Sequence, residues 1–539
     1  MAGGGWLGPS GYLARRRLRR PVLMPLALEG VRASRRAYTG RMASPAPKLR
    51  RNQIIDLTVT GLAFGGKGVA RIDDFVVFVS GAVPGDVTRA LVTKTKKRYA
   101  EARAVELVTH SPDRCDALCC SFGLCGGCVW QNLDYCVQLE YKARQVRESL
   151  EHLGGVSGFS LRSALGMANP WRYRNRADFS VGMTDEGAVV GFRPPGRWDS
   201  VLPLSECHLL GSAMEQVRGT VERWLRDSSL AGWDPRTATG FVRHLLVRSA
   251  RMGQEVLVSL VTTPADLPDT AGLVERLRSA HPEVVGIVHA TNGGRAEISS
   301  GLEWRALWGR PYLLEKVAGI TLKVSVDAFF QTNTLMAHAL YGLVACEAGL
   351  APIGPGAAGD PAMPGASVTP SGPVVWDLYS GVGSIGLSLA GRAKAVLGIE
   401  SVPAAVEDAH ENARLNGIDN AVFLEGDVGK VLREVADGTR RLPEGLERPD
   451  VIIVDPPRAG LSKKAISRIG EVAAPRIVYV SCNPTTMAPN VARFQEYGYR
   501  LERVTPVDMF PHTPHVEAVG LLAHEGRAER PFRVPADPS

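Results

Sequence analysis

The chain has 539 residues, of which 45% are apolar and 22% are charged, a composition typical of a globular protein. This length exceeds what one hydrophobic core serves, so we expect two or three domains. No apolar run approaches the 18 or so residues that cross a membrane, which excludes a membrane-spanning protein. The net charge of +8 is uneven, because residues 1–50 alone carry ten Arg, one Lys and a single acid. Nucleic-acid binding by the remainder must therefore depend on local patches such as Lys94, Lys96, Lys97 and Arg98.

The N-terminal 50 residues have the composition of an organelle transit peptide or of a disordered basic arm. A third reading stays open, because Met42 precedes the first ordered-looking sequence near Asn52. Residues 1–41 would then be an upstream extension outside the working protein. We expect residues 1–50 to be disordered and the protein to be cytoplasmic. An organelle is the alternative location if residues 1–41 are a transit peptide.

Residues 51–111 alternate short β-rich segments with turns such as Gly65-Gly66-Lys67-Gly68 and Pro84-Gly85-Asp86. Short strands at this spacing predict a small β-barrel. Barrels of this kind commonly bind single-stranded nucleic acid through surface strands and basic loops. The sequence therefore predicts a β-barrel that binds RNA.

Cysteines concentrate in the next segment, residues 112–160, where six of the nine in the chain lie between positions 115 and 136. A disulfide framework is typical of small secreted domains, so a metal or cluster site is preferred in a chain of this size. Cys119, Cys125 and Cys128 lie in one tight loop, and a fourth ligand must come from elsewhere. Cys207 is the best candidate. Only one CxxC pair is present, which favours an iron-sulfur cluster over zinc.

Residues 161–340 are predicted to form a mixed α/β domain. It opens on Trp171-Arg172-Tyr173-Arg174-Asn175-Arg176, a run that interleaves aromatic and basic side chains as RNA-stacking surfaces do. An edge strand with solvated Arg on one face is the alternative reading of this run. Residues 341–373 comprise most of a helix that starts near Thr334 and a Pro/Gly-rich flexible insertion.

Residues 374–525 alternate apolar strands with helices, which predicts a doubly wound sheet with parallel strands, followed by a short tail, residues 526–539. The glycine loop Gly381-Val382-Gly383-Ser384-Ile385-Gly386 lies between a strand and a helix, and Glu400 follows 19 residues after Gly381. A nicotinamide dehydrogenase would satisfy this pattern equally well. Asp377 before the loop and Asp455-Pro456-Pro457-Arg458 at a later strand end favour S-adenosylmethionine.

Cys482 follows the apolar run Val478-Tyr479-Val480-Ser481, which reads as a buried strand that delivers a thiol to the rim of the sheet. A cysteine at a strand end is often only a packed side chain. Here it shares one domain with the cofactor loop, which points to a nucleophile.

Six motifs occur together between residues 52 and 524. They are Cys119-x5-Cys125-Gly126-Gly127-Cys128, Phe330-Gln331-Thr332-Asn333, Asp377-Leu378-Tyr379-Ser380-Gly381, Asp455-Pro456-Pro457-Arg458-Ala459-Gly460, Ser481-Cys482-Asn483-Pro484, and Asp508-Met509-Phe510-Pro511-His512-Thr513 leading to His515-Val516-Glu517. In this combination the chain resembles the bacterial 23S ribosomal RNA (uracil-5-)-methyltransferases that carry a TRAM barrel and an iron-sulfur cluster.

The resemblance implies roles for individual residues. The cofactor contacts would be Gln331, Tyr379, Ser384, Glu400, Asp427 and Asp455. Cys482 would be the nucleophile and Glu517 the proton-abstracting base. A [4Fe-4S] cluster would be held by Cys119, Cys125, Cys128 and Cys207. A few inserted residues leave open whether Cys115 or Cys120 replaces Cys119.

The expected reaction is methyl transfer from S-adenosylmethionine to carbon 5 of a uridine in 23S ribosomal RNA, by an enzyme that acts as a monomer. Attack by the Cys482 thiolate at carbon 6 activates carbon 5, and the target base must leave its stack to reach the thiol. Asp455 or Arg458 would hold the uracil edge or orient Cys482. The same reaction on transfer RNA, an amino-group methyltransferase and a non-catalytic RNA-binding protein are the alternatives.

Overall fold

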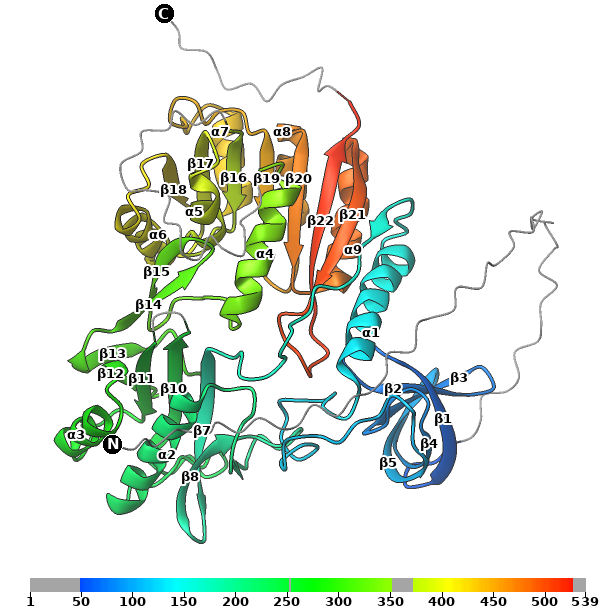
Figure 1. Cartoon of the computed structure of the whole chain (residues 1–539), viewed down its shortest axis with the longest axis vertical. Coiled ribbons are helices and arrows are strands. Elements are labelled where there is room, and N and C mark those ends of the chain that lie inside the picture. The colour runs from blue at the N-terminus through cyan, green and yellow to red at the C-terminus, as the bar shows by residue number, and fades with distance from the viewer. Residues whose placement is uncertain (1–48, 252–253, 351–371, 527–539) are drawn as a thin grey trace, which may run out of the picture. The chain divides into compact units, whose positions relative to one another are not determined.

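The computed structural model describes residues 49–251, 254–350 and 372–526 (Figure 1). Most of the expected basic extension, the Pro/Gly-rich insertion and the C-terminal tail lie outside these residues. Within the described ranges, none of the helices is both long and apolar enough to cross a bilayer.

The predicted N-terminal barrel is confirmed. It is a closed barrel of five strands in the order β1-β2-β3-β5-β4. The strands are β1 Ile54–Leu62, β2 Gly68–Ile72, β3 Phe75–Ser80, β4 Val87–Thr95 and β5 Tyr99–Thr109. Alternate apolar residues such as Val77, Val79 and Val92 fill the interior.

The cysteine segment follows and leads into helix α1 (Tyr135–Glu148). The Asp134 side chain caps this helix by accepting from the Cys136 main-chain NH at 2.8 Å. A π-helical turn, Ser149–Leu153, ends it. Strand β6 (Ser160–Leu161) then joins the edge of the C-terminal sheet.

The middle domain has the predicted mixed α/β character. Its seven-stranded sheet has the order β13-β12-β11-β10-β7-β8-β9. The strands are β7 Arg176–Thr184, β8 Gly187–Phe192, β9 Leu202–Pro203, β10 Val242–Ala250, β11 Glu255–Thr262, β12 Val284–Thr291 and β13 Glu303–Gly309. Helices α2 (Ser212–Asp227) and α3 (Thr270–Ala280) share one apolar cluster with it. The edge-strand reading of the aromatic and basic run is wrong, because only Arg176 enters β7, which lies inside the sheet.

The hairpin of β14 (Tyr312–Val317) and β15 (Ile320–Ser325) and helix α4 (Thr334–Glu347) connect the middle domain to the C-terminal sheet (Figure 1). Asn333 begins α4 by accepting from the Met336 main-chain NH at 3.2 Å. In this way the Phe330-Gln331 pair is placed directly before a helix that packs on the C-terminal sheet.

The predicted doubly wound C-terminal domain is confirmed and is larger than the sequence pattern indicated. Its sheet has eight strands in the order β18-β17-β16-β19-β20-β22-β21-β6. The strands are β16 Val374–Leu378, β17 Ala395–Glu400, β18 Ala421–Glu425, β19 Val451–Val454, β20 Arg476–Ser481, β21 Tyr499–Val507 and β22 Glu517–His524. Strands β16 to β20 are parallel, and β22 pairs antiparallel to both β20 and β21.

Helices cover both faces of this sheet. They are α5 Ser384–Ala390, α6 Pro403–Leu415, α7 Val428–Ala436, α8 Lys463–Val472 and α9 Pro484–Phe494. The side chains of β16 alternate between the two layers: Val375 packs with residues of α4, α5 and α6, whereas Trp376 packs with residues of α1, α7, α8 and α9. Burial on both faces explains why the parallel strands are almost wholly apolar.

Candidate active site

A cavity of about 1100 Å³ opens at the carboxyl ends of the parallel strands. Ligands of doubly wound sheets bind at this edge, because the strand-to-helix loops meet there. The residues that line it include seven of the eight residues assigned to cofactor binding or catalysis: Gln331, Tyr379, Ser384, Glu400, Asp455, Cys482 and Glu517. Motifs spread over 187 positions of the chain therefore converge on one cavity.

The glycine loop has the strained geometry that its sequence suggests. Gly381 and Gly383 have φ values of 55° and 80°, and Tyr379 also lies in the left-handed region at 69°. A Cβ on Gly383 would lie 2.8 Å from the Phe423 ring, so a larger residue does not fit. A Cβ on Gly381, by contrast, would meet nothing within 4 Å, so the space beside this residue is open to a ligand.

Asp377 lies beneath this loop and is 1% exposed. Its Oδ2 accepts from the Gly386 main-chain NH at 2.8 Å, while Oδ1 has no hydrogen-bond partner among the described residues. Burial, with a smaller effect of the Glu400 charge, raises the pKa of Asp377 to about 7. The loop is therefore tied to a carboxyl group that gives up its proton near neutral pH.

Glu400 ends β17 and is held by the backbone. Its Oε2 accepts from the Gly381 NH at 3.0 Å, and its Oε1 accepts from the NH groups of Ser401 at 2.6 Å and Val402 at 2.9 Å. Oε1 is fully occupied, because the Ser401 hydroxyl also donates to it, whereas Oε2 can accept a second hydrogen bond and so can still bind a ribose hydroxyl of a nucleoside.

Two further residues of the cavity, Ser384 and Gln331, are held by hydrogen bonds from other elements. The Tyr341 hydroxyl of α4 donates to Ser384 Oγ at 3.0 Å. The main-chain oxygen of Gln331 accepts from Asn175 Nδ2 at 2.9 Å. Residues of other elements therefore hold the Ser384 side chain and the Gln331 main chain.

Asp427 is the one predicted cofactor residue outside the cavity lining. Its side chain caps α7 by accepting from the Lys430 NH at 2.9 Å. The charge of Asp427 contributes to raising the pKa of Tyr379, so Asp427 lies close to the cavity although it does not line it. Its predicted role in cofactor binding stays a prediction.

Cys482 and Glu517 come together through the pairing of β20 with β22. Ser481 pairs with Ala518, so the thiol that follows β20 and the carboxyl that begins β22 lie at the same end of adjacent strands. Burial raises the pKa of Cys482 to about 11, and the charges of Glu517 and Asp455 act in the same direction. The positive charge of Arg458 acts in the opposite direction and lowers the pKa of Cys482. The thiol is therefore neutral in this structure.

The two carboxyl groups near the thiol are also shifted. Burial and the charge of Asp455 raise the pKa of Glu517 to about 8, and Arg458 opposes this. Burial and the charge of Asp377 raise the pKa of Asp455 to about 7. A cationic ligand in the cavity would favour the ionised form of all these groups. This arrangement suits a site that receives a sulfonium.

The sequence motifs contain Phe510 and His515, but sequence reasoning did not identify Phe329 and Trp304 as residues of the cavity. Phe329 and Trp304 line it and are 70% and 43% exposed, and His515 and Phe510 also line it. The doubled Phe329-Phe330 was the only local signal, since one of two adjacent side chains must point away from the core. Nothing local distinguishes Trp304.

The four cysteines assigned to a cluster are half-buried free thiols, whereas Cys115, Cys120 and Cys136 are exposed. Burial, together with the charges of Cys207, Cys125 and Cys119, raises the pKa of Cys128 to about 12. The four side chains thus share one neighbourhood. A Cβ on Gly126 would lie 3.2 Å from the Arg193 main-chain oxygen, so the backbone is closely packed there.

Across residues 49–251, 254–350 and 372–526, no group of three or more His, Cys, Asp or Glu side chains is arranged to hold a metal ion. Cys115 Sγ contacts the Gln131 main-chain oxygen at 3.3 Å, and Cys120 Sγ lies 3.0 Å from Ser205 Oγ. The predicted iron-sulfur cluster stays a prediction.

Comparison with known proteins agrees with this geometry. Residues 370–525 match the tRNA (Uracil-5-)-methyltransferase family and residues 48–105 match the TRAM domain. An uncharacterized RNA methyltransferase of Halalkalibacterium halodurans is 35% identical over 482 residues, which cover 89% of this chain and 99% of the relative. One of Nitratidesulfovibrio vulgaris is 38% identical over 474 residues, covering 87% and 96%.

The crystal structure of the Pyrococcus abyssi tRNA (uracil-54, C5)-methyltransferase in complex with S-adenosyl-L-homocysteine superposes with a TM-score of 0.66. It is 27% identical and covers 87% of this chain and 99% of that one. The amino-group methyltransferase and the non-catalytic RNA-binding protein are therefore set aside. The chain belongs to the family of S-adenosylmethionine-dependent RNA (uracil-5-)-methyltransferases.

Proposed function

We propose that this enzyme methylates carbon 5 of one uridine through a covalent adduct between Cys482 and carbon 6 of the base. The observation that carries the proposal is the placement of Cys482 and Glu517 at the ends of paired strands, in the same cavity as the glycine loop. Bound S-adenosylmethionine supplies the methyl group as a sulfonium.

The chain's own residues would act in order. The Cys482 thiolate adds to carbon 6, and the electron pair of the C5–C6 double bond moves toward the carbonyl at carbon 4. Carbon 5 then takes the methyl group, and the electron pair of the broken sulfur–methyl bond stays on the sulfur, which leaves neutral S-adenosylhomocysteine. Glu517 removes the proton from carbon 5, the C5–C6 double bond forms again, and the bond between sulfur and carbon 6 breaks. The thiolate and a neutral, methylated base remain.

Arg458 and Asp455 are proposed to support the first step. Arg458 favours the thiolate of Cys482 and the carboxylate of Glu517. Asp455 is half-buried at the end of the neighbouring strand β19 and would hold the uracil edge or orient Cys482. The target base must leave its stack to enter the cavity. Phe329 at the cavity is suited to stack on a base.

We propose 23S ribosomal RNA as the substrate, on the family resemblance of the barrel and the cysteine segment taken together. Transfer RNA is the second candidate, because the solved relative from Pyrococcus abyssi is a tRNA enzyme. The barrel, residues 51–111, and the middle domain, residues 161–340, would grip the RNA while residues 374–525 perform the transfer.

We also propose that Cys119, Cys125, Cys128 and Cys207 hold a [4Fe-4S] cluster. Four thiolates are the donor set that such a cluster requires, and these four are the half-buried cysteines of the segment and its surroundings. The cluster would tie the cysteine segment to the middle domain, 79 residues further along the chain. Its role would be structural.

The test is to map 5-methyluridine in ribosomal and transfer RNA from a strain that lacks the gene. We expect one site to be lost, to return with the wild-type gene, and to stay absent with Cys482→Ala. Loss in 23S ribosomal RNA supports the first substrate and loss in transfer RNA the second. An unchanged modification map in both RNAs would refute the proposed function.

A further inference from the structure

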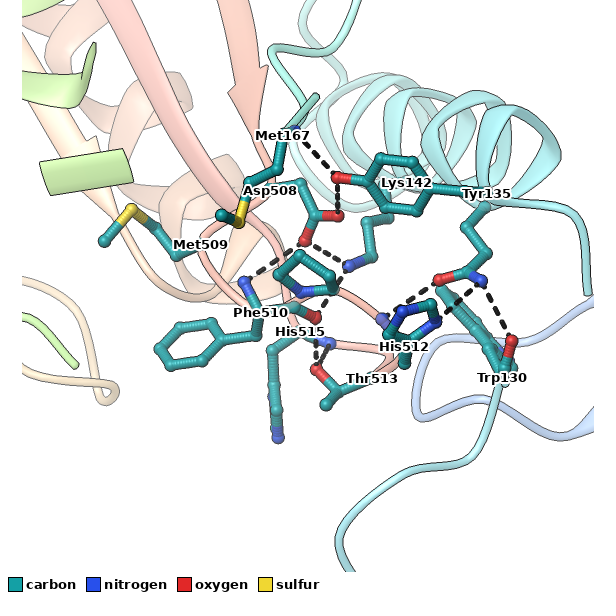
Figure 2. A network of polar contacts seen from close by, with 12 residues as sticks. Trp130, Tyr135, Lys142, Met167, Asp508, Met509, Phe510, His512, Thr513 and His515 are labelled. Atoms are coloured by element: carbon teal, nitrogen blue, oxygen red, sulfur yellow. Dashed lines mark hydrogen bonds and ion pairs between the residues drawn. The ribbon is translucent and has the colours of Figure 1, made fainter. Parts of the chain in front are cut away.

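A loop of nine residues, 508–516, joins β21 to β22 and ends directly before Glu517 (Figure 2). Val507 pairs with Glu517, so both ends of the loop are fixed by the sheet. Phe510 and His515 of this loop line the cavity. The 508–516 loop therefore carries two residues that line the cavity and leads directly into Glu517, the first residue of β22.

An ion pair holds the start of the loop. Lys142 of α1 donates from Nζ to Asp508 Oδ1 at 2.5 Å, and both side chains are 0% exposed (Figure 2). Lys142 Nζ also donates to the main-chain oxygen of Phe510 at 3.1 Å. Asp508 Oδ1 accepts from the Phe510 NH at 3.2 Å. The pair thus fixes both polar main-chain groups of Phe510.

Tyr135, which lies about two turns before Lys142 in α1, completes the environment of Asp508. Its hydroxyl donates to Asp508 Oδ2 at 2.9 Å and accepts from the Met167 NH at 2.9 Å (Figure 2). Both carboxylate oxygens of Asp508 are therefore occupied by donors of the helix that follows the cysteine segment.

Gln138 of the same helix holds the middle of the loop. Its Oε1 accepts from the His512 NH at 3.0 Å, and its Nε2 donates to the Trp130 main-chain oxygen at 2.9 Å. The His512 main-chain oxygen accepts from the NH groups of Val129 and Trp130 at 3.0 and 3.1 Å. His512 has a φ of 64°, so the loop is held in a conformation that a His rarely adopts.

A buried ion pair contributes little net stability, because both charges lose their hydration, and its best-attested use is to specify one geometry. Here α1 contacts the loop through hydrogen bonds to the Asp508 side chain and to main-chain atoms of Phe510 and His512, which fix direction and not only distance. Helix α1 also shares the apolar cluster of the C-terminal sheet through Val146. Helix α1 can therefore stay packed on the sheet without the Lys142–Asp508 ion pair. The ion pair can then act on the conformation of the loop.

We propose that Lys142 and Asp508 are a positioning pair that holds the 508–516 loop so that Glu517 reaches the proton on carbon 5 of the bound uracil. This inference rests on the proposed function, in which Glu517 is the base. Cys482 and the glycine loop lie on other strands and do not depend on the pair. Its loss should therefore slow the last step of the reaction and leave cofactor binding, thiol attack and methyl transfer intact.

The experiment uses the full chain with Asp508→Asn and with the double substitution Lys142→Met/Asp508→Asn. The double variant removes both charges, so it keeps the test valid if an unpaired Lys142 prevents folding. The probe is a transcript of the RNA region whose 5-methyluridine depends on this gene. With S-adenosylmethionine, we expect kcat about 10- to 100-fold below wild type, since a small misplacement of a reacting group has this effect. The KM for S-adenosylmethionine should be unchanged.

Two further measurements separate positioning from a loss of folded protein. The protein-RNA adduct that survives denaturing electrophoresis should accumulate in both variants. In a transcript made with 5-fluorouridine, carbon 5 has no proton to remove, so the adduct persists whichever base is present. The variants should form this fluorinated adduct at the wild-type rate, which only an intact thiol and cofactor site allow.

Glu347→Gln is the matched control. Glu347 is a buried carboxylate, 2% exposed, whose ion pair with Arg503 at 2.7 Å contacts the same strand β21 away from the loop. It should lower stability without accumulation of the adduct on ordinary RNA.

The outcomes for the pair and for the proposed function are distinct. If Glu517→Gln itself gives no adduct on ordinary RNA, the assignment of Glu517 as base fails. If Glu517→Gln accumulates adduct but both variants at Lys142 and Asp508 turn over like wild type, the positioning pair is overturned. A slower fluorinated adduct in those variants also overturns it, because the defect would then precede proton removal.

Discussion

Cys482 and Glu517 face the same cavity because Ser481 of β20 pairs with Ala518 of β22. The thiol therefore comes from the end of one strand and the carboxyl from the beginning of its antiparallel neighbour. In a doubly wound sheet, a catalytic pair of this kind requires a reversed strand next to the parallel ones. The position of β22 is thus a condition for the proposed chemistry.

Cys482→Ala should abolish methylation and adduct formation and leave the binding of S-adenosylmethionine within about twofold of wild type. The thiol attacks the base, whereas the cofactor is held by the glycine loop, Glu400 and their neighbours. Calorimetric titration and a methylation assay on the purified protein check both parts. Methylation that persists in this variant would contradict the covalent mechanism.

The fold and the cofactor site could be read from local patterns, since each depends on strand periodicity and on glycine loops a few residues long. The 508–516 loop could not be read in this way. Lys142 lies between Glu140 and Arg144, which suggests a solvated helix, yet its partner Asp508 lies 366 residues later and buries it completely. Strands β21 and β22 were also missed, and in β21 the apolar alternation is shifted by the irregularity between Leu501 and Arg503.

The rate of methylation should rise with pH between about 6 and 9, because Glu517 acts as a base only after it loses a proton and burial raises its pKa to about 8. Asp455→Asn removes a negative charge beside Glu517, lowers its pKa and should move this rise to lower pH. Arg458→Gln removes a positive charge and should move it to higher pH. Single-turnover rates across the pH range measure both shifts, and shifts of the same sign would exclude this electrostatic account.

The stability of the cofactor-free protein should fall as pH rises. Burial raises the pKa values of Asp377 and Asp455 to about 7 and that of Glu517 to about 8. The folded state therefore holds protons that the unfolded chain releases near pH 4. The stabilisation is complete below about pH 4 and is lost as the pH passes through 7 to 8.

Asp377→Asn removes one of these titrating groups, so its Tm should decrease less than that of wild type between pH 5 and pH 8. Thermal unfolding followed by circular dichroism at several pH values gives the comparison. Asp56→Asn is a suitable control, since Asp56 is an exposed carboxylate of the barrel, and its Tm should follow wild type. Parallel curves for Asp377→Asn and wild type would show that this carboxyl group titrates normally.

Protein purified without oxygen should contain about four irons per chain, the content of one [4Fe-4S] centre. Cys207→Ser should lower the iron content and weaken RNA binding, while S-adenosylmethionine binds as in wild type. Cys346→Ser is the control, because Cys346 is an exposed thiol on α4. One zinc and no iron would refute the cluster, and full iron content in Cys207→Ser would move the fourth ligand to Cys115, Cys120 or Cys136.

Phe329 is expected to bind the RNA at the cavity. Its side chain is 70% exposed, although the chain on either side is fixed: Arg248 Nη2 donates to the Ala328 main-chain oxygen at 2.6 Å, and Phe330 is 7% exposed. An aromatic ring held in solvent next to a cavity is available for stacking on a base, which is worth about 1–3 kcal/mol.

Phe329→Ala should therefore raise the KM for RNA by about 5- to 150-fold, the range that this stacking energy corresponds to. The KM for S-adenosylmethionine should stay unchanged, since Phe329 does not support the glycine loop. Trp198→Ala is the matched control, because Trp198 is an aromatic residue 61% exposed that does not line the cavity. Equal effects of the two substitutions on RNA binding would mean that Phe329 contributes only general surface and not a specific stacking contact.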